Sequence, residues 1–467
     1  MVQGVYDFSY SSELDKLSEL NLDPLIQLLQ MSWFTRLWVF QEVAFAKDIV
    51  VLCGERVIPW WRLAQSVMHL HRKGILLEYE DFNKAMIGVK AVLEMEKVRQ
   101  RVEKNNMPRD LVSVLLATSA AKCTDPRDKI FAVLGLVDEE YLRLDKTLQI
   151  EVDYAEDVGQ VYRNLAQKCI AVRDLRILSC VSQRDRTLLD KEINIPSWVP
   201  DWTAVENDNP FTRYNLHTLF PEAQYLSSEQ QPEVNESGVL QLPCLEIDQI
   251  ESIVPITTFT KTPLRRRPWS FGSQEAMTGN LQWLEACREL LVQHGAVKQK
   301  HRPIREEGTS KEVSSDSLWF VLAAGLSGTA LPVEAHQESH FARYVALVRK
   351  IVCAPYEPRI FVTDRDEVIA AVEASVHLWS SKRLFGITKL GRAVLVPQGT
   401  RKGDRIVLPA FSVVPLVVRE PEGERWEGTL LGEAFVRDVM NGQYVQEFNK
   451  THRRIEDSRR YAVWMIS

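Results

Sequence analysis

The stretch Pro196-Ser197-Trp198-Val199-Pro200-Asp201-Trp202 separates two parts of the chain that differ in character. Its two prolines restrict the backbone and its two tryptophans are large, so we expect a stiff aromatic loop. Before this loop apolar residues recur at helical spacing, and after it strand patterns become frequent. The sequence therefore predicts the α+β class, with a mainly helical N-terminal part and a mixed C-terminal part that ends in a small antiparallel sheet.

Upstream of this loop, apolar side chains recur every three or four residues, which is the period of an amphipathic helix. Leu25, Leu29 and Phe40 belong to the first such pattern, which predicts one helix from residue 25 to about residue 46. A short β-branched run over residues 49–52 predicts a strand. Further helices are predicted over residues 60–71, 80–104, 109–121 and 155–172.

Downstream of the loop, the pattern predicts both helices and strands. Polar and charged residues dominate the stretch 295–317, which predicts a mobile insertion. Helices are expected over residues 281–293, 317–326 and 338–353. Strands are expected over residues 239–250, 393–396, 405–408, 413–419 and 429–436.

Composition excludes several classes of partner and location. The 467 residues include 57 Lys and Arg and 63 Asp and Glu, a net charge of −6 that gives no reason to expect a nucleic-acid partner. The seven cysteines are widely spaced, which is typical of an intracellular protein without a disulfide framework. Because no apolar run is long enough for a signal peptide or a membrane span, we expect a cytoplasmic protein without membrane insertion.

The common ligand-binding motifs are absent from the sequence. It contains no Gly-x-x-x-x-Gly-Lys-Ser/Thr loop, no Gly-x-Gly-x-x-Gly loop after a strand and no Cys-x-x-Cys pair. We therefore expect no cofactor and no metal site.

The densest cluster of aromatic and polar residues is Trp33-Phe34-Thr35-Arg36-Leu37-Trp38-Val39-Phe40-Gln41-Glu42. On a helix, Trp38, Gln41 and Glu42 share one face because they stand three and four positions apart. Arg36 is offset from this face and is expected to serve a different contact. Such a cluster suits either a ligand pocket or a core helix whose polar groups satisfy neighbouring segments.

The loop at residues 196–202 is a second candidate region. Its composition suits a packing clamp and a ligand wall equally well. The candidate catalytic residues are Arg36, Gln41, Glu42 and Asp201, and the candidate substrate-binding residues are Trp38, Trp198 and Trp202.

The segment Thr124-Asp125-Pro126-Arg127-Asp128 has the features of a helix start. Asp125 can accept hydrogen bonds from free N–H groups, and Pro126 has a φ angle that suits the first helical turn. Asp128 lies where the helix dipole favours a carboxylate. Capping and the start of a helix therefore explain Asp125, Arg127 and Asp128 without a functional role.

Taken in order, these segments resemble those of the fungal heterokaryon-incompatibility (HET) family. The matching pieces extend over nearly the whole chain, and it is their order and spacing that carries the resemblance. They are Trp33-Phe34-x-Arg36-x-Trp38-x-x-Gln41-Glu42, Cys53-Gly54 with Trp60 or Trp61, Asp125-Pro126-Arg127-Asp128-Lys129-Ile130-Phe131-Ala132-Val133-Leu134-Gly135-Leu136, Asp153-Tyr154, residues 196–202, residues 240–250, Gly391-Arg392 to Pro397, Gly403-Asp404 and Gly432-Glu433-Ala434 to Met440-Asn441-Gly442.

The sequence departs from the family pattern at its start. Such proteins begin with a Leu-Ser-Tyr-x-Trp-Gly-like strand and later carry a Cys-Ile-Asn-Gln-like motif, in a domain similar to the Toll/interleukin-receptor fold. Neither motif is present here. The resemblance implies that residues 1–46 are a remnant of this domain that keeps its last helix. A helical region over 47–222 and a mixed region over 223–467 then follow.

Two functions of different classes remain open. The resemblance implies a scaffold related to non-self recognition and cell death, with loss of effector activity, that acts by binding another protein. The alternative is a cofactor-free cyclase, for example of the Diels–Alder type, recruited to fungal secondary metabolism. Such an enzyme would hold a small hydrophobic molecule in a shaped aromatic pocket.

Overall fold

The computed structural model describes residues 21–72, 82–104, 109–139, 141, 146–181, 194–204, 210–211, 225–254, 274–294, 318–324, 341–342, 344–346, 349, 376, 379–380, 383–423 and 425–467. The chain divides into two compact units. Unit 1 comprises Met1–Met107, Ala120–Lys122 and Pro263–Trp269, and unit 2 comprises the rest. The domain limits expected at residues 46 and 222 stay a prediction. The insertion expected at 295–317 lies outside the described residues.

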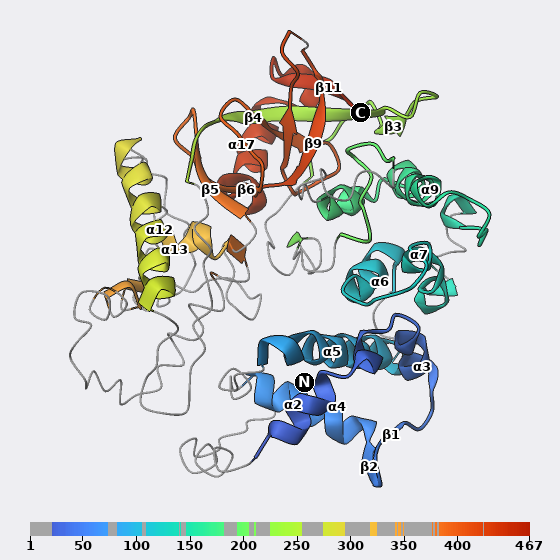
Figure 1. The fold of residues 1–467 in the computed structure, drawn as a ribbon. Helices are drawn as coiled ribbons and strands as arrows, with labels where there is room; N and C mark the ends of the chain where they lie inside the picture. The colour runs from blue at the N-terminus through green and yellow to red at the C-terminus, as the bar shows by residue number, and fades with distance from the viewer. Residues whose placement is uncertain are drawn as a thin grey trace. The chain divides into compact units, whose positions relative to one another are not determined.

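Unit 1 is built around the long helix α5 (Phe82–Lys104) (Figure 1). Gly88 of α5 lies against the backbone of Leu29, since a Cβ atom at this glycine would stand 1.9 Å from the Leu29 carbonyl oxygen. Only glycine permits so close an approach of two helices. The elements of unit 1 that contact α5 are α2 (Asp23–Leu29), the 3-10 helix η1 (Ser32–Thr35), α3 (Val39–Phe45) and α4 (Trp60–Arg72).

The single helix predicted over residues 25–46 is wrong, because this segment folds as α2, η1 and α3. The apolar period still marks the buried side, and Leu29 and Phe34 are each 1% exposed. At Arg36, however, the backbone is extended and forms a β-bridge with Lys122. The Leu37 N–H donates to the Lys122 carbonyl at 2.9 Å in place of a helical hydrogen bond. Local periodicity carries no information about this distant partner.

The first part of unit 2 is helical, as predicted. Two of its helices begin at aspartates that accept a hydrogen bond of 2.9 Å from the first turn: Asp110 from the Ser113 N–H, and Asp157 from the Gly159 N–H. The elements are α6 (Leu111–Thr118), α7 (Asp128–Phe131), η3 (Leu134–Leu136), η4 (Lys146–Leu148), α9 (Val158–Ala171) and η5 (Leu175–Cys180).

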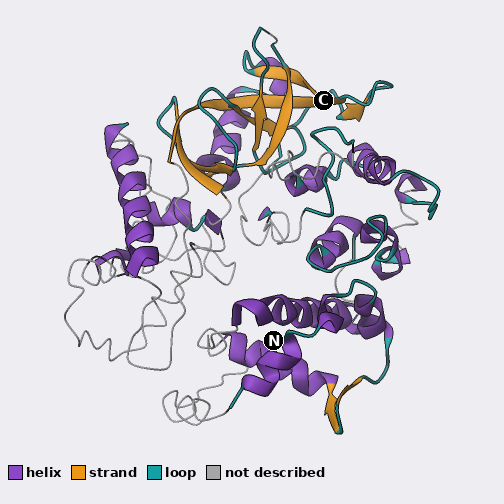
Figure 2. Ribbon diagram, viewed as in Figure 1, coloured by secondary structure: helices purple, strands orange, loops and turns teal. Residues whose placement is uncertain are grey.

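The second part of unit 2 contains a sheet in which nine of the described strands are joined (Figure 2). Neighbouring strands are antiparallel except β9 and β11, which run parallel. The order is β10-β6-β5-β4-β11-β9-β8-β7, with β3 also paired to β4. The strands are β3 (Glu233–Val234), β4 (Leu240–Val254), β5 (Arg383–Thr388), β6 (Ala393–Pro397), β7 (Arg405–Pro409), β8 (Leu416–Arg419), β9 (Glu427–Glu433), β10 (Phe435–Val436) and β11 (Tyr461–Ile466).

Strand β4 organises this sheet. Cys244 and Leu245 pair with β11 on one side and with β7 on the other, so the path β4-β11-β9-β8-β7 closes on itself. The far end of β4, from Ile250, pairs with β5 instead. One long strand therefore belongs both to a closed ring of strands and to an open extension.

Both faces of the β5–β6 extension are buried. Successive side chains alternate, so that Phe385 and Leu395 belong to one apolar cluster and Leu384 and Val394 belong to another. The first cluster includes residues of α12 (Gln274–Gln293) and α13 (Leu318–Leu322). The second includes residues of α16 (Arg437–Met440), α17 (Gln443–Thr451) and the 3-10 helix η9 (Ile455–Asp457).

The predicted α+β class is confirmed, with a helical N-terminal part and a sheet-rich C-terminal part. The sheet also contains β11, which the sequence pattern did not predict and which pairs with β4 along its whole length. Among the described residues, no helix is both long and apolar enough to cross a membrane.

Candidate functional site

The predicted face of Trp38, Gln41 and Glu42 is present at the start of α3. Trp38 precedes the helix, and its carbonyl accepts from the Gln41 N–H at 3.1 Å and from the Glu42 N–H at 3.3 Å. Trp38 is 42% exposed, and Glu42 is also exposed. Arg36 precedes this turn in extended backbone with an exposed side chain. The structure therefore brings three candidates onto one surface turn and leaves Arg36 apart from it.

The end of α3 is held by Arg99 of α5. Its guanidinium donates to the carbonyls of Val43 at 2.9 Å, Ala46 at 2.5 Å and Lys47 at 3.0 Å, and it pairs with Glu103 at 2.7 Å. These carbonyls have no partner within the helix, so a cation at this point satisfies them and complements the helix dipole. Arg99 thus fixes the direction in which the chain leaves α3.

The chain that leaves α3 forms an unusual hairpin of β1 (Val50–Cys53) and β2 (Arg56–Pro59). The register pairs Val50 with Pro59 and Leu52 with Val57, so these four side chains share one face. Val50 is 57% exposed, Leu52 70% and Val57 60%. A solvent-facing side of a hairpin is normally polar, whereas this side is entirely apolar. We call Val50, Leu52, Val57 and Pro59 the apolar face of unit 1.

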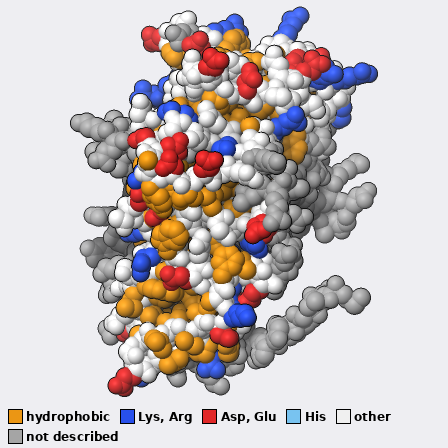
Figure 3. Space-filling view, turned by 90° about the vertical axis from the view of Figure 1, so that its right-hand side faces the viewer, with side chains coloured by type: hydrophobic (Ala, Val, Ile, Leu, Met, Phe, Trp, Pro, Cys, Tyr) orange, Lys and Arg blue, Asp and Glu red, His pale blue; other side chains and the backbone are white. Residues whose placement is uncertain are grey.

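Further exposed aromatic residues occur on the elements that flank the hairpin in the chain. Trp61, at the start of α4, is 55% exposed, and Phe45, at the end of α3, is 52% exposed. Trp60, the residue before Trp61, is buried, and its indole Nε1–H donates to the Glu96 carboxylate at 2.8 Å. Figure 3 shows hydrophobic side chains gathered over the side of the molecule that carries α3 and the hairpin. The sequence analysis did not predict this surface. The run Val50-Val51-Leu52 contains no polar residue that would mark a solvent-facing side of the strand.

The loop at residues 196–202 belongs to unit 2, and its tryptophans face inward. Trp198 is 0% and Trp202 is 1% exposed. The Trp198 indole N–H donates to the Gly238 carbonyl at 3.1 Å, whereas the Trp202 N–H is buried without an acceptor among the described residues. Asp201 accepts from the backbone N–H and the hydroxyl of Thr203, at 2.9 and 2.6 Å. These contacts favour packing and turn formation as the role of the loop.

Ser197 connects the same loop to the C-terminal strands. Its N–H donates to the Ser467 carbonyl at 3.0 Å, and its hydroxyl donates to the same carbonyl. The hydroxyl oxygen also accepts from the Leu430 N–H of β9 at 3.0 Å. The loop therefore joins β9 to the end of the chain.

Residues 125–128 contact the Asp153-Tyr154 pair, so two of the segments that carry the resemblance meet in space. Arg127 makes two hydrogen bonds to Asp125, at 2.9 and 2.8 Å, and donates to the carbonyls of Tyr154 and Glu156. The bonds from Arg127 hold the pKa of Asp125 below its ordinary value. The Tyr154 hydroxyl donates to Asp128 at 2.6 Å, which raises the pKa of Tyr154 to about 12.

The capping role predicted for residues 125–128 is present only in part, because α7 has no side-chain hydrogen bond at its N-cap residue, Arg127. The Asp125 side chain accepts from the Arg127 N–H at 3.0 Å, directly ahead of α7. The Tyr162 hydroxyl of α9 donates to the Pro126 carbonyl at 2.8 Å. The segment is thus a structural junction between α7, α9 and residues 153–156.

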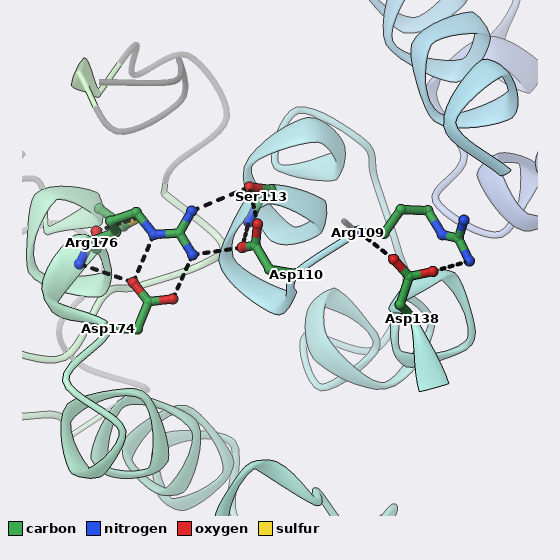
Figure 4. Close-up of polar contacts among 7 residues, drawn as sticks. Arg109, Asp110, Ser113, Asp138, Asp174 and Arg176 are labelled. Carbon is green, nitrogen blue, oxygen red and sulfur yellow. Dashed lines mark hydrogen bonds and ion pairs between the residues drawn. The ribbon is translucent and has the colours of Figure 1, made fainter. Parts of the chain in front are cut away.

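A charged cluster that the sequence pattern did not single out connects α6 to η5 (Figure 4). Arg176 binds Asp174 through two hydrogen bonds, at 2.7 and 2.6 Å, and binds Asp110 at 2.7 Å. Burial would raise the pKa of the Asp110 carboxyl, but Arg176 and the Ser113 N–H more than offset this and lower it. The same figure shows Arg109 beside Asp138, whose carboxylate accepts from the Arg109 N–H at 2.6 Å.

A second missed group is the buried pair Arg383 and Glu433. Their side chains meet at 2.5 Å, and Glu433, which is 5% exposed, also accepts from the Phe211 N–H at 3.0 Å. Arg383 lies 4.5 Å from the centre of the Phe211 ring, which stacks on Trp379. Burial raises the pKa of Glu433 to about 7 despite these favourable partners. A glutamate between Gly432 and Ala434 in an otherwise apolar stretch is the sequence signal that could have pointed to it.

The charged side chains of these two groups are hydrogen-bonded to the structural partners named above, and neither group presents an arrangement typical of a catalytic centre. Within the part of the chain that the structure describes, no group of three His, Cys, Asp or Glu residues is placed to hold a metal ion. The apolar face of unit 1 is therefore the feature that internal contacts explain least.

Comparisons with known proteins give one partial likeness. The chain is 27% identical over 197 residues to heterokaryon incompatibility protein 6, OR allele, of Neurospora crassa. The aligned region covers 38% of this chain and 28% of that protein, so the match spans less than a third of the relative. No family profile matches the chain, and no solved structure matches it significantly.

Proposed function

We propose that this chain is a fungal, cytoplasmic protein related to heterokaryon incompatibility that takes part in non-self recognition and cell death by binding another protein. The partial likeness to the Neurospora protein supports the class of function. The observation that carries the mode of action is the apolar face of unit 1, where Leu52 is 70% exposed. Exposed apolar surface rimmed by polar residues is typical of protein interaction sites.

The residues around the apolar face support a protein partner. Trp38 and Trp61 are exposed aromatics, a residue type enriched in protein interfaces. Trp198 and Trp202, by contrast, are buried and have no free surface for a ligand. The comparisons give no support to the cyclase alternative. The binding of a small hydrophobic molecule stays a prediction.

The proposal is tested by inducible expression of the chain in a fungal host. We expect wild-type protein to arrest growth, and Val57→Lys to relieve the arrest because a charge in the apolar face disfavours binding. Val292→Lys is the matched control, since Val292 of α12 is 62% exposed and Val57 is 60% exposed. Healthy growth of transformants that contain the wild-type protein would contradict the role in cell death.

The loss of effector activity that the missing motifs predict would leave growth unaffected, so the same assay decides between that prediction and the proposed role in cell death. Growth arrest caused by the chain alone would show that an effector output is retained. If wild type and Val57→Lys arrested growth equally, the apolar face would have no part in the proposed mode of action.

A further inference from the structure

The apolar face of unit 1 exposes apolar side chains that another apolar surface could bury. Val50, Leu52 and Val57 are exposed side by side on one side of a two-stranded hairpin. Within the described residues, neither strand of this hairpin pairs with a third strand. A small exposed apolar sheet of this kind favours association with another surface.

The charged residues at the two ends of the hairpin indicate which kind of protein surface would bind the apolar face. Lys47 and Asp48 stand where the chain enters β1, and Glu55 and Arg56 stand at the turn. All four residues are exposed. Each end therefore carries both signs, and the basic residue of one end has an acidic counterpart at the other.

A second copy of this hairpin satisfies these requirements. When two hairpins stack face to face about a two-fold axis that lies across the strands, the turn of one copy lies over the open end of the other. Glu55, at the turn, then lies near Lys47 of the second copy. A strongly one-signed rim would repel its own copy, whereas this rim is complementary to itself.

We infer that the apolar face binds the same face of a second copy of this chain, in a two-fold contact with the hairpins stacked turn to open end. This inference rests on the proposed use of the apolar face for protein binding and names its partner. Such isologous contacts are the commonest kind in homo-oligomers. A stable interface takes about 800 Å² from each partner, so we expect exposed residues next to the hairpin in the chain, such as Trp61, to take part in the contact.

The test is the oligomeric state of the full chain, measured by sedimentation velocity over a range of protein concentrations. We expect wild type to form dimers as the concentration rises. Val57→Lys should weaken dimerisation at least tenfold, and the matched Val292→Lys should leave it unchanged. A wild type that stays monomeric at about 100 µM, the concentration scale for weak complexes, would overturn the inference, as would equal behaviour of the two lysine variants.

A charge exchange tests the stacking geometry without disturbing the apolar side chains. Lys47→Glu and Glu55→Lys should each weaken the dimer at low salt, and the double variant should recover it because each new charge again meets its opposite. Failure of the double variant to recover would contradict the proposed arrangement. Circular dichroism of each variant shows whether the fold is retained.

The outcomes for self-association and for the proposed function are distinguishable. If wild type is monomeric while Val57→Lys still relieves growth arrest, the apolar face binds a different protein and only the inference of self-association is wrong. If wild type dimerises through this face without any effect on growth, the inference holds and the proposed function fails.

Discussion

Arg176 and Asp110 lie 66 positions apart in the sequence, and the guanidinium of the first donates a hydrogen bond of 2.7 Å to the carboxylate of the second. The same carboxylate caps α6 by accepting from the Ser113 N–H at 2.9 Å. Asp110 therefore links a local helix start to a long-range ion pair. Two different substitutions of Asp110 can therefore separate the contribution of the cap to stability from that of the ion pair.

We expect Asp110→Ala to lower the free energy of unfolding by about 2–3 kcal/mol, because it removes both the cap and a charged hydrogen bond. Asp110→Asn keeps a capping oxygen and should cost about 1 kcal/mol. Urea denaturation at pH 7 measures both. Equal costs for the two variants would contradict a separate contribution from the cap, since both variants lose the charged bond to Arg176.

The pair also predicts a pH dependence. Because Arg176 and Ser113 lower the pKa of Asp110 in the folded state, its stabilising contribution is present above the unfolded value of about 4. It is lost as the pH falls through the lower folded value. The difference in unfolding free energy between wild type and Asp110→Asn should therefore shrink in acid below about pH 4.

Gly88→Ala should destabilise unit 1. The new Cβ would meet the Leu29 carbonyl oxygen at 1.9 Å, so α2 and α5 would have to separate. We expect a loss of about 2 kcal/mol or more, measured by thermal unfolding. Gly279→Ala in α12 is the control, because no atom lies within 4 Å of its Cβ position. It should stabilise the protein by about 0.5–1 kcal/mol, and similar effects of the two changes would contradict the close approach.

Trp198→Phe should cost more stability than Trp202→Phe. Both rings are buried, so both changes remove similar apolar volume. Only Trp198 donates to a carbonyl, that of Gly238, whereas Trp202 buries an N–H without an acceptor. The difference should be about 1–2 kcal/mol in chemical denaturation. An equal or larger cost at Trp202 would contradict this assignment of the two indoles.

Glu433 predicts a second pH dependence, opposite in direction to that of Asp110. Burial raises its folded pKa to about 7, so the folded chain keeps a proton that the unfolded chain has released. The free energy of unfolding should therefore fall as the pH rises from about 4.5 to 7, by about 3 kcal/mol at most.

Glu433→Gln carries no titrating group, so its profile should be flatter than that of wild type over this window. The comparison requires urea denaturation at several pH values. Glu427→Gln on the same strand is the control, because Glu427 is exposed. Parallel profiles for wild type and Glu433→Gln would contradict the raised pKa.

Contacts between nearby residues could be predicted from the sequence, because their partners lie within one helical turn or one hairpin. The apolar periods of α4 and α5 are in this class, as is the hydrogen bond from the Arg127 N–H to Asp125. The α+β class follows from the same local patterns. The candidate face of Trp38, Gln41 and Glu42 also follows from helical spacing, and the helical turn at Trp38 preserves it.

Contacts between distant residues were decided only by the tertiary structure. The bridge to Lys122 breaks the predicted helix at Arg36, and Arg383 finds Glu433 across 50 positions. Whether a tryptophan is buried like Trp198 or exposed like Trp38 depends on which elements pack over it. Local patterns determine where helices and strands form, whereas the free energy of burial, which depends on all neighbours together, determines which apolar surfaces remain free.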